Sequence, residues 1–146
     1  MSPVGMIVQT RAYRAPEGAL VYGWTLVADM WSYGAIVCEM VLGHELFPNA
    51  QTLENIFSMY EVLFGRVPDK MLQPMHRKYF NEYGELLERK MPASSLNHVI
   101  ESHSLSMLLR SHDHTLKDFI LGLLQVDPDN RMTAQQALTH SFLRLR

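Results

Sequence analysis

The sequence predicts a mainly α-helical protein with a single domain, and three observations support this prediction. Its 146 residues suit one domain of ordinary size. Hydrophobic residues make up 47% of the chain, which is enough for a packed core and argues against disorder. The most regular segments place apolar residues at helical spacing rather than in the alternation of a strand. We therefore expect several helices packed around one core.

Charge and cysteine content exclude several functional classes. The formal net charge is −2 and the isoelectric point is about 6.4, so no overall charge favours nucleic acid or anionic lipid. The single cysteine, Cys38, allows no internal disulfide and suits a reducing compartment. No signal peptide is visible at the N-terminus. We expect an intracellular protein, nuclear or cytoplasmic, with neither nucleic acid nor membrane as a partner.

A central helix is predicted within residues 25–43, over VADMWSYGAIVCEMVL. Apolar residues cover nearly its whole circumference, so we expect burial on all sides; Asp29 and Glu39 argue against a membrane span. Thr25 is the expected N-cap and Gly43 the expected C-terminal cap. Asp29 is the exception, because a carboxylate near the start of a buried helix needs hydrogen-bond donors. Either the helix dipole favours it or it anchors the backbone of another segment.

Residues 9–17, QTRAYRAPE, precede this helix as an irregular segment rich in polar side chains. Loops with this many directed polar groups often carry function. Composition alone favours an ordinary solvated loop, so the segment is only a candidate.

Further helices follow the central one. Residues 52–65 predict a helix capped by Thr52 and ended by Gly65. Residues 66–114 are less regular, with short helices expected near 71–73, 86–91 and 105–110.

The C-terminal part, residues 115–146, predicts two helices. One runs over residues 116–126 and is stopped by Asp127-Pro128. The other begins with a capping box of Thr133 and Gln136 and runs to about His140.

No self-contained active site is visible from the residues alone. The histidines are scattered and lack cysteine partners at zinc-site spacing. Glycine-rich phosphate loops and Gly-x-Ser-x-Gly are absent, and no nucleophile has an evident base. The basic and aromatic run at residues 76–80 is too short to indicate nucleic-acid binding.

Three short motifs nevertheless resemble those of eukaryotic protein kinases. Residues 10–17 resemble the end of the activation segment, with its Ala-Pro-Glu motif. Residues 29–34, DMWSYG, resemble the Asp-x-Trp-Ser-x-Gly motif that opens the kinase F helix. Residues 127–131, DPDNR, resemble the Asp-Pro-x-x-Arg motif before the last helix. All three stand in the family's order and spacing.

The resemblance implies that residues 1–146 are a partial kinase domain, the lower half of a C-lobe without the N-lobe sheet. In chain order it implies the end of the activation segment (1–24), the central F helix (25–43), a second helix (52–65), an insert typical of the CMGC group (66–114) and the last helices (115–146).

Within the kinases, the chain resembles the CMGC group, and most of all the LAMMER (CDC-like) kinases. Ile7 stands where mitogen-activated and dual-specificity tyrosine-regulated kinases have a tyrosine, and cyclin-dependent kinases usually lack an arginine at Arg11. Residues 57–62, FSMYEV, align with the LAMMER signature but keep only Met59 and Glu61.

The resemblance implies roles for residues of the substrate loop. Thr10 would lie where the residue after the phosphorylated one is received, and would contact the catalytic aspartate. Arg14, with Arg11, would orient that loop. Glu39 lies where some kinases read basic substrate residues; the alternative is an internal partner for Arg11 or Arg14.

The resemblance also implies structural roles. Glu17 would pair with Arg131, tying the activation segment to the last helices. Asp29 would accept hydrogen bonds from the catalytic-loop backbone, and Trp31 belongs to the same helix motif.

The family's cofactors are ATP and Mg²⁺, which are held by a glycine-rich loop, a strand lysine, a catalytic-loop Asp and Asn, and the Asp of Asp-Phe-Gly. None of these motifs occurs in this sequence. We therefore expect no cofactor, metal or catalytic residue here, and a fragment of a serine/threonine or dual-specificity kinase that is incompetent alone.

The expected partners are protein substrates, Arg/Ser-rich ones among them, and a missing N-terminal kinase half. That half should cover the central helix, so without it a large apolar patch should be exposed. Two alternatives stay open: a full kinase encoded by a longer reading frame, and a non-catalytic docking module derived from a kinase C-lobe.

Overall fold

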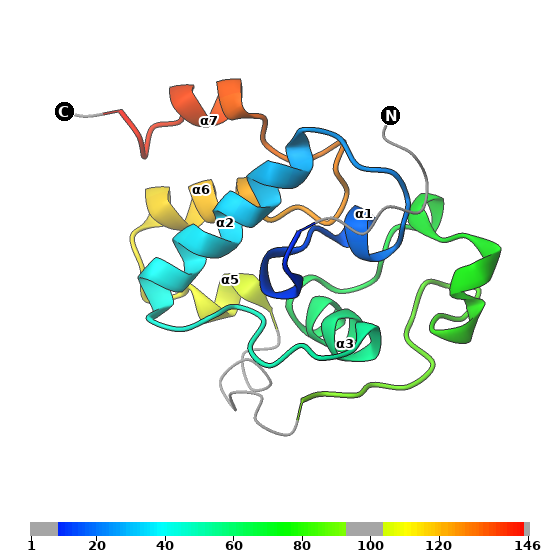
Figure 1. Ribbon diagram of the computed structural model, residues 1–146. Helices are drawn as coiled ribbons and strands as arrows, with labels where there is room; N and C mark the ends of the chain where they lie inside the picture. The colour runs from blue at the N-terminus through cyan, green and yellow to red at the C-terminus, as the bar shows by residue number, and fades with distance from the viewer. Residues whose placement is uncertain (1–8, 93–103, 145–146) are drawn as a thin grey trace.

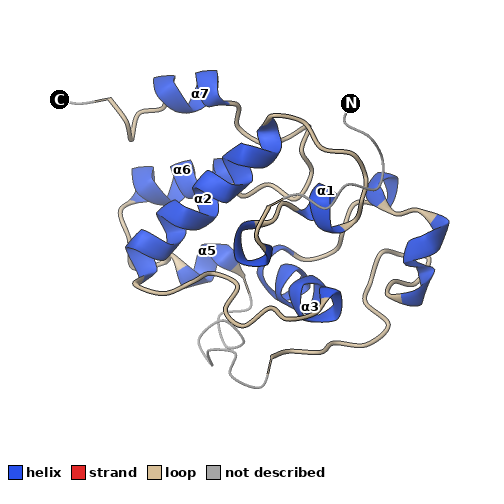
Figure 2. Ribbon diagram, in the orientation of Figure 1, coloured by secondary structure: helices blue, strands red, loops and turns tan. Residues whose placement is uncertain are grey.

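A computed structural model describes residues 9–92 and 104–144 of the chain. Within these ranges every regular element is a helix, and the only extended pairing is an isolated antiparallel bridge between Phe80 and Leu86 (Figure 2). The prediction of a mainly helical fold is therefore confirmed. In chain order the elements are η1 (Arg11–Tyr13), α1 (Pro16–Ala19), α2 (Val27–Leu42), α3 (Leu53–Phe64), η2 (Asp69–Met71), η3 (Pro74–Lys78), α5 (Leu105–Leu108), α6 (His114–Leu123) and α7 (Ala134–Thr139).

Helix α2 crosses the middle of the molecule, and the other elements are arranged around it (Figure 1). It packs against α6 on one side and against the η1 turn on another. In the described ranges, no helix has the length and apolar character needed to cross a membrane.

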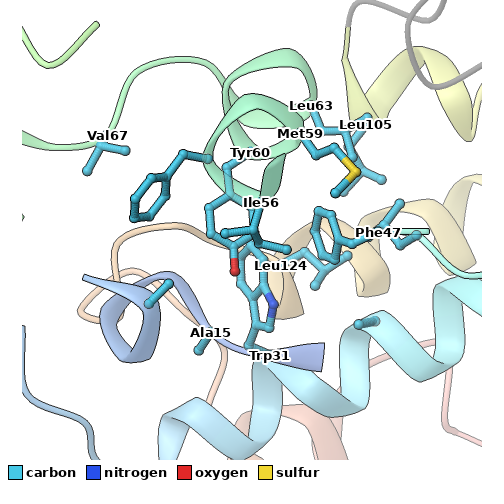
Figure 3. Packing of buried hydrophobic residues seen from close by; sticks show 14 of the residues in the cluster. Ala15, Trp31, Phe47, Ile56, Met59, Tyr60, Leu63, Val67, Leu105 and Leu124 are labelled. Atoms are coloured by element: carbon cyan, nitrogen blue, oxygen red, sulfur yellow. The ribbon is translucent and has the colours of Figure 1, made fainter. Parts of the chain in front are cut away.

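The core is built around the indole of Trp31, which has no exposed surface (Figure 3). Its ring stacks on that of Phe47, with 6.1 Å between the ring centroids, and packs edge-on against that of Tyr60, with 5.6 Å between the centroids. Such aromatic pairs add to the free energy gained by burying their area. They join α2 to α3 and to the connection between these two helices.

The ends of α2 lie where the sequence predicts, but the N-cap differs. Gly43 ends the helix with φ of 78°, in the left-handed region that suits glycine. The N-cap is Leu26, which makes no side-chain capping bond, so the prediction of Thr25 as N-cap is wrong. Thr25 instead accepts the Ala28 N–H at its backbone carbonyl, at 3.0 Å.

One face of α2 is exposed, so the prediction that the helix is buried all round is wrong. Its apolar members are Leu26 (84% exposed), Tyr33 (40%), Ile36 (45%) and Met40 (79%). These positions recur at helical spacing and form one stripe, which we call the α2 apolar face. The opposite side is fully packed, and burial there raises the pKa of the Cys38 thiol to about 12. The helix therefore buries one side and exposes the α2 apolar face on the other.

The second helix and the last one confirm their predicted caps. The Thr52 side chain accepts the Asn55 N–H, which completes a capping box at α3. Thr133 forms the predicted capping box with Gln136 at α7. Helix α6 ends at Leu123, earlier than predicted, and Asp113 caps its start.

The predicted short helix at residues 86–91 is wrong, because side chains of α3 bind the backbone of this segment. Glu61 accepts the Leu86 N–H at 3.1 Å, and Ser58 Oγ accepts the Lys90 N–H at 2.7 Å. Asn55 Nδ2 donates to the Lys90 carbonyl at 2.8 Å. These backbone groups are satisfied without helical bonds. The short helices expected near 71–73 and 105–110 are displaced and shortened, to Asp69–Met71 with Pro74–Lys78 and to Leu105–Leu108.

Candidate functional site

Residues 9–15 form a loop that lies along α2, and we call it the 9–15 loop. Its η1 turn places Tyr13 against the helix, where the phenol donates to Glu39 Oε2 at 2.7 Å. Ser32 Oγ donates to the Tyr13 carbonyl at 2.7 Å. The hydrogen bond to Glu39, together with burial and the nearby negative charges of Glu39 and Glu45, raises the pKa of Tyr13. Side chains of α2 thus hold the loop at its middle.

The two arginines of the 9–15 loop bind backbone carbonyls rather than Glu39. Arg11 Nη1 donates to the Gln51 carbonyl, and Arg14 Nη2 donates to the Gln9 carbonyl at 2.9 Å. Between the described residues, no hydrogen bond or ion pair joins Glu39 to Arg11 or Arg14, and the Tyr13 phenol donates to Glu39 Oε2 instead. Both arginines still brace the loop, through its own backbone and through the α2–α3 connection.

Thr10 is exposed at the start of η1 and makes no side-chain capping bond there. Among the candidates of the substrate loop, Thr10, Arg11 and Arg14 lie in the 9–15 loop, and Tyr13 of the same loop contacts Glu39 on α2.

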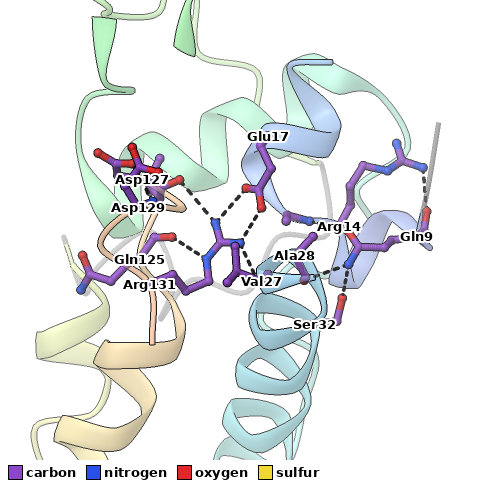
Figure 4. A network of polar contacts seen from close by, with 12 residues as sticks. Gln9, Arg14, Glu17, Val27, Ala28, Ser32, Gln125, Asp127, Asp129 and Arg131 are labelled. Atoms are coloured by element: carbon purple, nitrogen blue, oxygen red, sulfur yellow. Dashed lines mark hydrogen bonds and ion pairs between the residues drawn. The ribbon is translucent and has the colours of Figure 1, made fainter. Parts of the chain in front are cut away.

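Glu17 and Arg131 form a fully buried ion pair that joins α1 to the segment before α7 (Figure 4). The two guanidinium Nη atoms lie 2.5 and 2.8 Å from the carboxylate oxygens. Arg131 also donates to the Gln125 and Val27 carbonyls, both at 3.0 Å, and its Cζ lies 5.3 Å from the Trp31 ring centre. A bidentate pair with every remaining N–H directed at an acceptor compensates the desolvation of both charges.

Asp29 is exposed near the start of α2, on the same side as the apolar face. Within the ranges that the structure covers, no hydrogen bond or ion pair to its carboxylate is found. Its expected role, accepting bonds from the backbone of another segment, stays a prediction. Trp31, two residues later, points to the opposite side and lies at the centre of the core.

Sequence reasoning missed Gln9 and Ser32 as site residues. Gln9 makes three side-chain hydrogen bonds to α2 and to the loop itself, and Ser32 receives one of them. Nothing in the local sequence signals this, because the partners are 6 to 23 residues away.

Among the residues with described positions, no group of three or more His, Cys, Asp or Glu side chains could hold a metal ion.

Comparison with known proteins shows the family. The protein kinase domain family matches residues 2–143. The serine/threonine-protein kinase AFC2 of Arabidopsis thaliana is 37% identical over 96% of this chain and 34% of its own length. The human dual specificity protein kinase CLK1 is 35% identical over 95% of this chain and 29% of its own length. The chain thus spans about a third of these relatives.

Solved structures agree with the sequence matches. One crystal structure of a kinase domain aligns with a TM-score of 0.76 and 32% identity, covering 92% of this chain and 40% of that one. The MAP kinase LmaMPK10 of Leishmania major aligns with a TM-score of 0.69 and 25% identity, covering 92% of this chain and 37% of that one. The helical fold predicted as part of a kinase C-lobe is confirmed. This chain belongs to the protein kinase domain family, in the CMGC group that contains the LAMMER (CDC-like) kinases.

Proposed function

We propose that this chain is the substrate-binding lower half of a serine/threonine or dual-specificity kinase domain and does not transfer phosphate on its own. One observation carries the proposal: the α2 apolar face is open to solvent, with the exposed carboxylate of Asp29 beside it. Leu26 and Met40 are more than three-quarters exposed at the two ends of a helix that is otherwise the centre of the fold. A stripe of this kind marks a surface that another polypeptide segment covers.

The N-terminal half of a kinase domain is the proposed occupant of the α2 apolar face. The family's ATP and Mg²⁺ ligands would come with that half, because the sequence of this chain contains none of their motifs. Phosphoryl transfer depends almost entirely on positioning and charge stabilisation, so without those ligands the chain has no means to accelerate it. An intracellular site of action, nuclear or cytoplasmic, belongs to the same proposal.

Protein substrates are proposed to bind over the 9–15 loop, Arg/Ser-rich segments among them. Thr10 and Arg11 are exposed there. Glu39 uses Oε2 for Tyr13, and the charge of Glu45 also acts on that phenol, so two carboxylates lie near the loop. Carboxylates so placed would attract arginine side chains of a substrate.

Two measurements on the purified chain test this proposal. We expect no phosphate transfer from ATP above background, and saturable binding of an Arg/Ser-repeat peptide that weakens in the variant Glu39→Gln. A Ser/Asp-repeat peptide is the control and should not bind. Turnover by the chain, with contaminating kinases excluded, would overturn the claim of incompetence. Equal binding of the two peptides would overturn the assignment of the substrate loop.

A non-catalytic docking module is the second candidate, favoured by the completeness of the core around Trp31. A module of this kind should be a monomer that unfolds in one cooperative transition while still binding the peptide. A half that needs a partner should instead self-associate through the α2 apolar face and bind an apolar dye. Sedimentation and dye fluorescence at several chain concentrations separate the two.

A further inference from the structure

The Gln9 side chain joins the 9–15 loop to Ala28 and Ser32 of α2 (Figure 4) and also bonds Ala15 at the end of the loop. Its Nε2 donates to the Ala28 carbonyl at 2.9 Å and to Ser32 Oγ at 2.7 Å. Its Oε1 accepts the Ala15 N–H at 3.0 Å. The two backbone partners define the orientation of the amide, because a carbonyl only accepts and an N–H only donates. Gln9 therefore links the helix and the far end of the loop at once.

The groups that bond Gln9 depend on its side chain for their hydrogen bonds. Ala15 has no exposed surface, so its N–H is screened from water and would lose its acceptor if the glutamine were shortened. Ser32 Oγ connects Gln9 to Tyr13, because it accepts a hydrogen bond from Gln9 Nε2 and donates one to the Tyr13 carbonyl at 2.7 Å. One side chain thus fixes both the middle and the end of the loop.

The backbone of Gln9 has an unfavourable conformation, which these hydrogen bonds help to stabilise. Its φ is 68°, in the left-handed region that non-glycine residues seldom adopt. This conformation directs the Gln9 carbonyl to Arg14 Nη2, at 2.9 Å. Strained conformations persist only where the surroundings over-determine them, and they gather at functional segments.

We propose that Gln9 is a positioning residue for substrate binding, which holds the 9–15 loop in one conformation before a peptide arrives. This rests on the proposed function of that loop. Gln9 itself need not touch the substrate, because it acts through Ser32, Tyr13 and Ala15. A loop that is already ordered loses less conformational entropy when a peptide binds, so preorganisation should appear as affinity.

Amide hydrogen exchange on the full chain tests the linkage directly. Gln9→Met keeps the length of the side chain but removes its donors and its acceptor, while Gln9→Gly also relieves the positive φ. Exchange at the Ala15 amide should become about tenfold faster in both variants, the size expected for losing a buried hydrogen bond. Gln135→Met, at an exposed position on α7, is the matched control and should leave it unchanged. Unchanged exchange in Gln9→Met, or slower exchange in Gln9→Gly, would overturn the linkage.

Peptide affinity tests the positioning role, with the Arg/Ser-repeat peptide as probe. Gln9→Met should weaken binding by about the same factor as it speeds exchange at Ala15, while Gln135→Met should bind like the unchanged chain. Faster exchange with unchanged affinity would overturn the positioning role. If the unchanged chain binds no peptide, the proposed function of the loop is refuted and the positioning role with it. The exchange rates still show whether Gln9 holds the loop against α2.

Discussion

Replacing Arg131 by alanine should cost this chain a large part of its stability. The guanidinium is 0% exposed and its partner Glu17 only 1%, so the substitution leaves a buried carboxylate without its counter-charge. The Gln125 and Val27 carbonyls would lose their donor as well. Breaking a buried pair from one side costs about 3–5 kcal/mol. Total stabilities are about 5–15 kcal/mol, so the loss would be at least about a fifth of the total.

Urea unfolding followed by tryptophan fluorescence measures this loss, because Trp31 lies next to Arg131. The matched control is Arg89→Ala, which breaks an ion pair to Glu61 whose arginine side chain is 55% exposed. That exposed pair should contribute at most about 1 kcal/mol.

A double variant separates the charge from the packing. Glu17→Gln together with Arg131→Met removes both charges and should lose less free energy of unfolding than Arg131→Ala alone, because no unpaired ion remains buried. If Arg131→Ala costs no more than Arg89→Ala, or if the double variant is the least stable of the three, the reasoning from burial is refuted.

Three further outcomes are expected. Gly34→Ala should cost about 1–3 kcal/mol in thermal unfolding, because the added Cβ would come within 2.8 Å of a side-chain carbon on α6. Glu39→Gln should lower the raised pKa of Tyr13, as measured by an ultraviolet pH titration. The hydrogen bond that raises this pKa stabilises the fold at pH values below the ordinary tyrosine pKa, and that stabilisation is lost as the pH rises through the pKa of the folded chain. The variant should therefore be less stable than the unchanged chain at neutral pH. Met40→Lys should reduce apolar-dye binding and self-association while changing stability by less than about 0.5 kcal/mol, whereas Met59→Lys, at a site with no exposure, should unfold the chain.

Local sequence was enough to predict the caps of α3 and α7 and the C-terminal end of α2. The capping boxes at Thr52 and Thr133 and the glycine at Gly43 act within one turn of the backbone, so their positions can be predicted without tertiary information. The three motifs resembling those of kinases are equally local, and the comparisons confirm the family that they indicate.

Only the tertiary structure decided which surfaces and partners these helices use. The family resemblance predicted an exposed apolar patch on the central helix, but the pattern of α2 is apolar on every side and could not show that the open stripe runs from Leu26 to Met40. Glu39 had several possible partners, and the η1 turn decided for Tyr13 by bringing its phenol to the carboxylate. Gln9 became a link to α2 only because folding brought Ala28 and Ser32 beside it. Neighbouring residues determine short-range backbone preferences, whereas contacts between distant segments depend on how the whole chain packs.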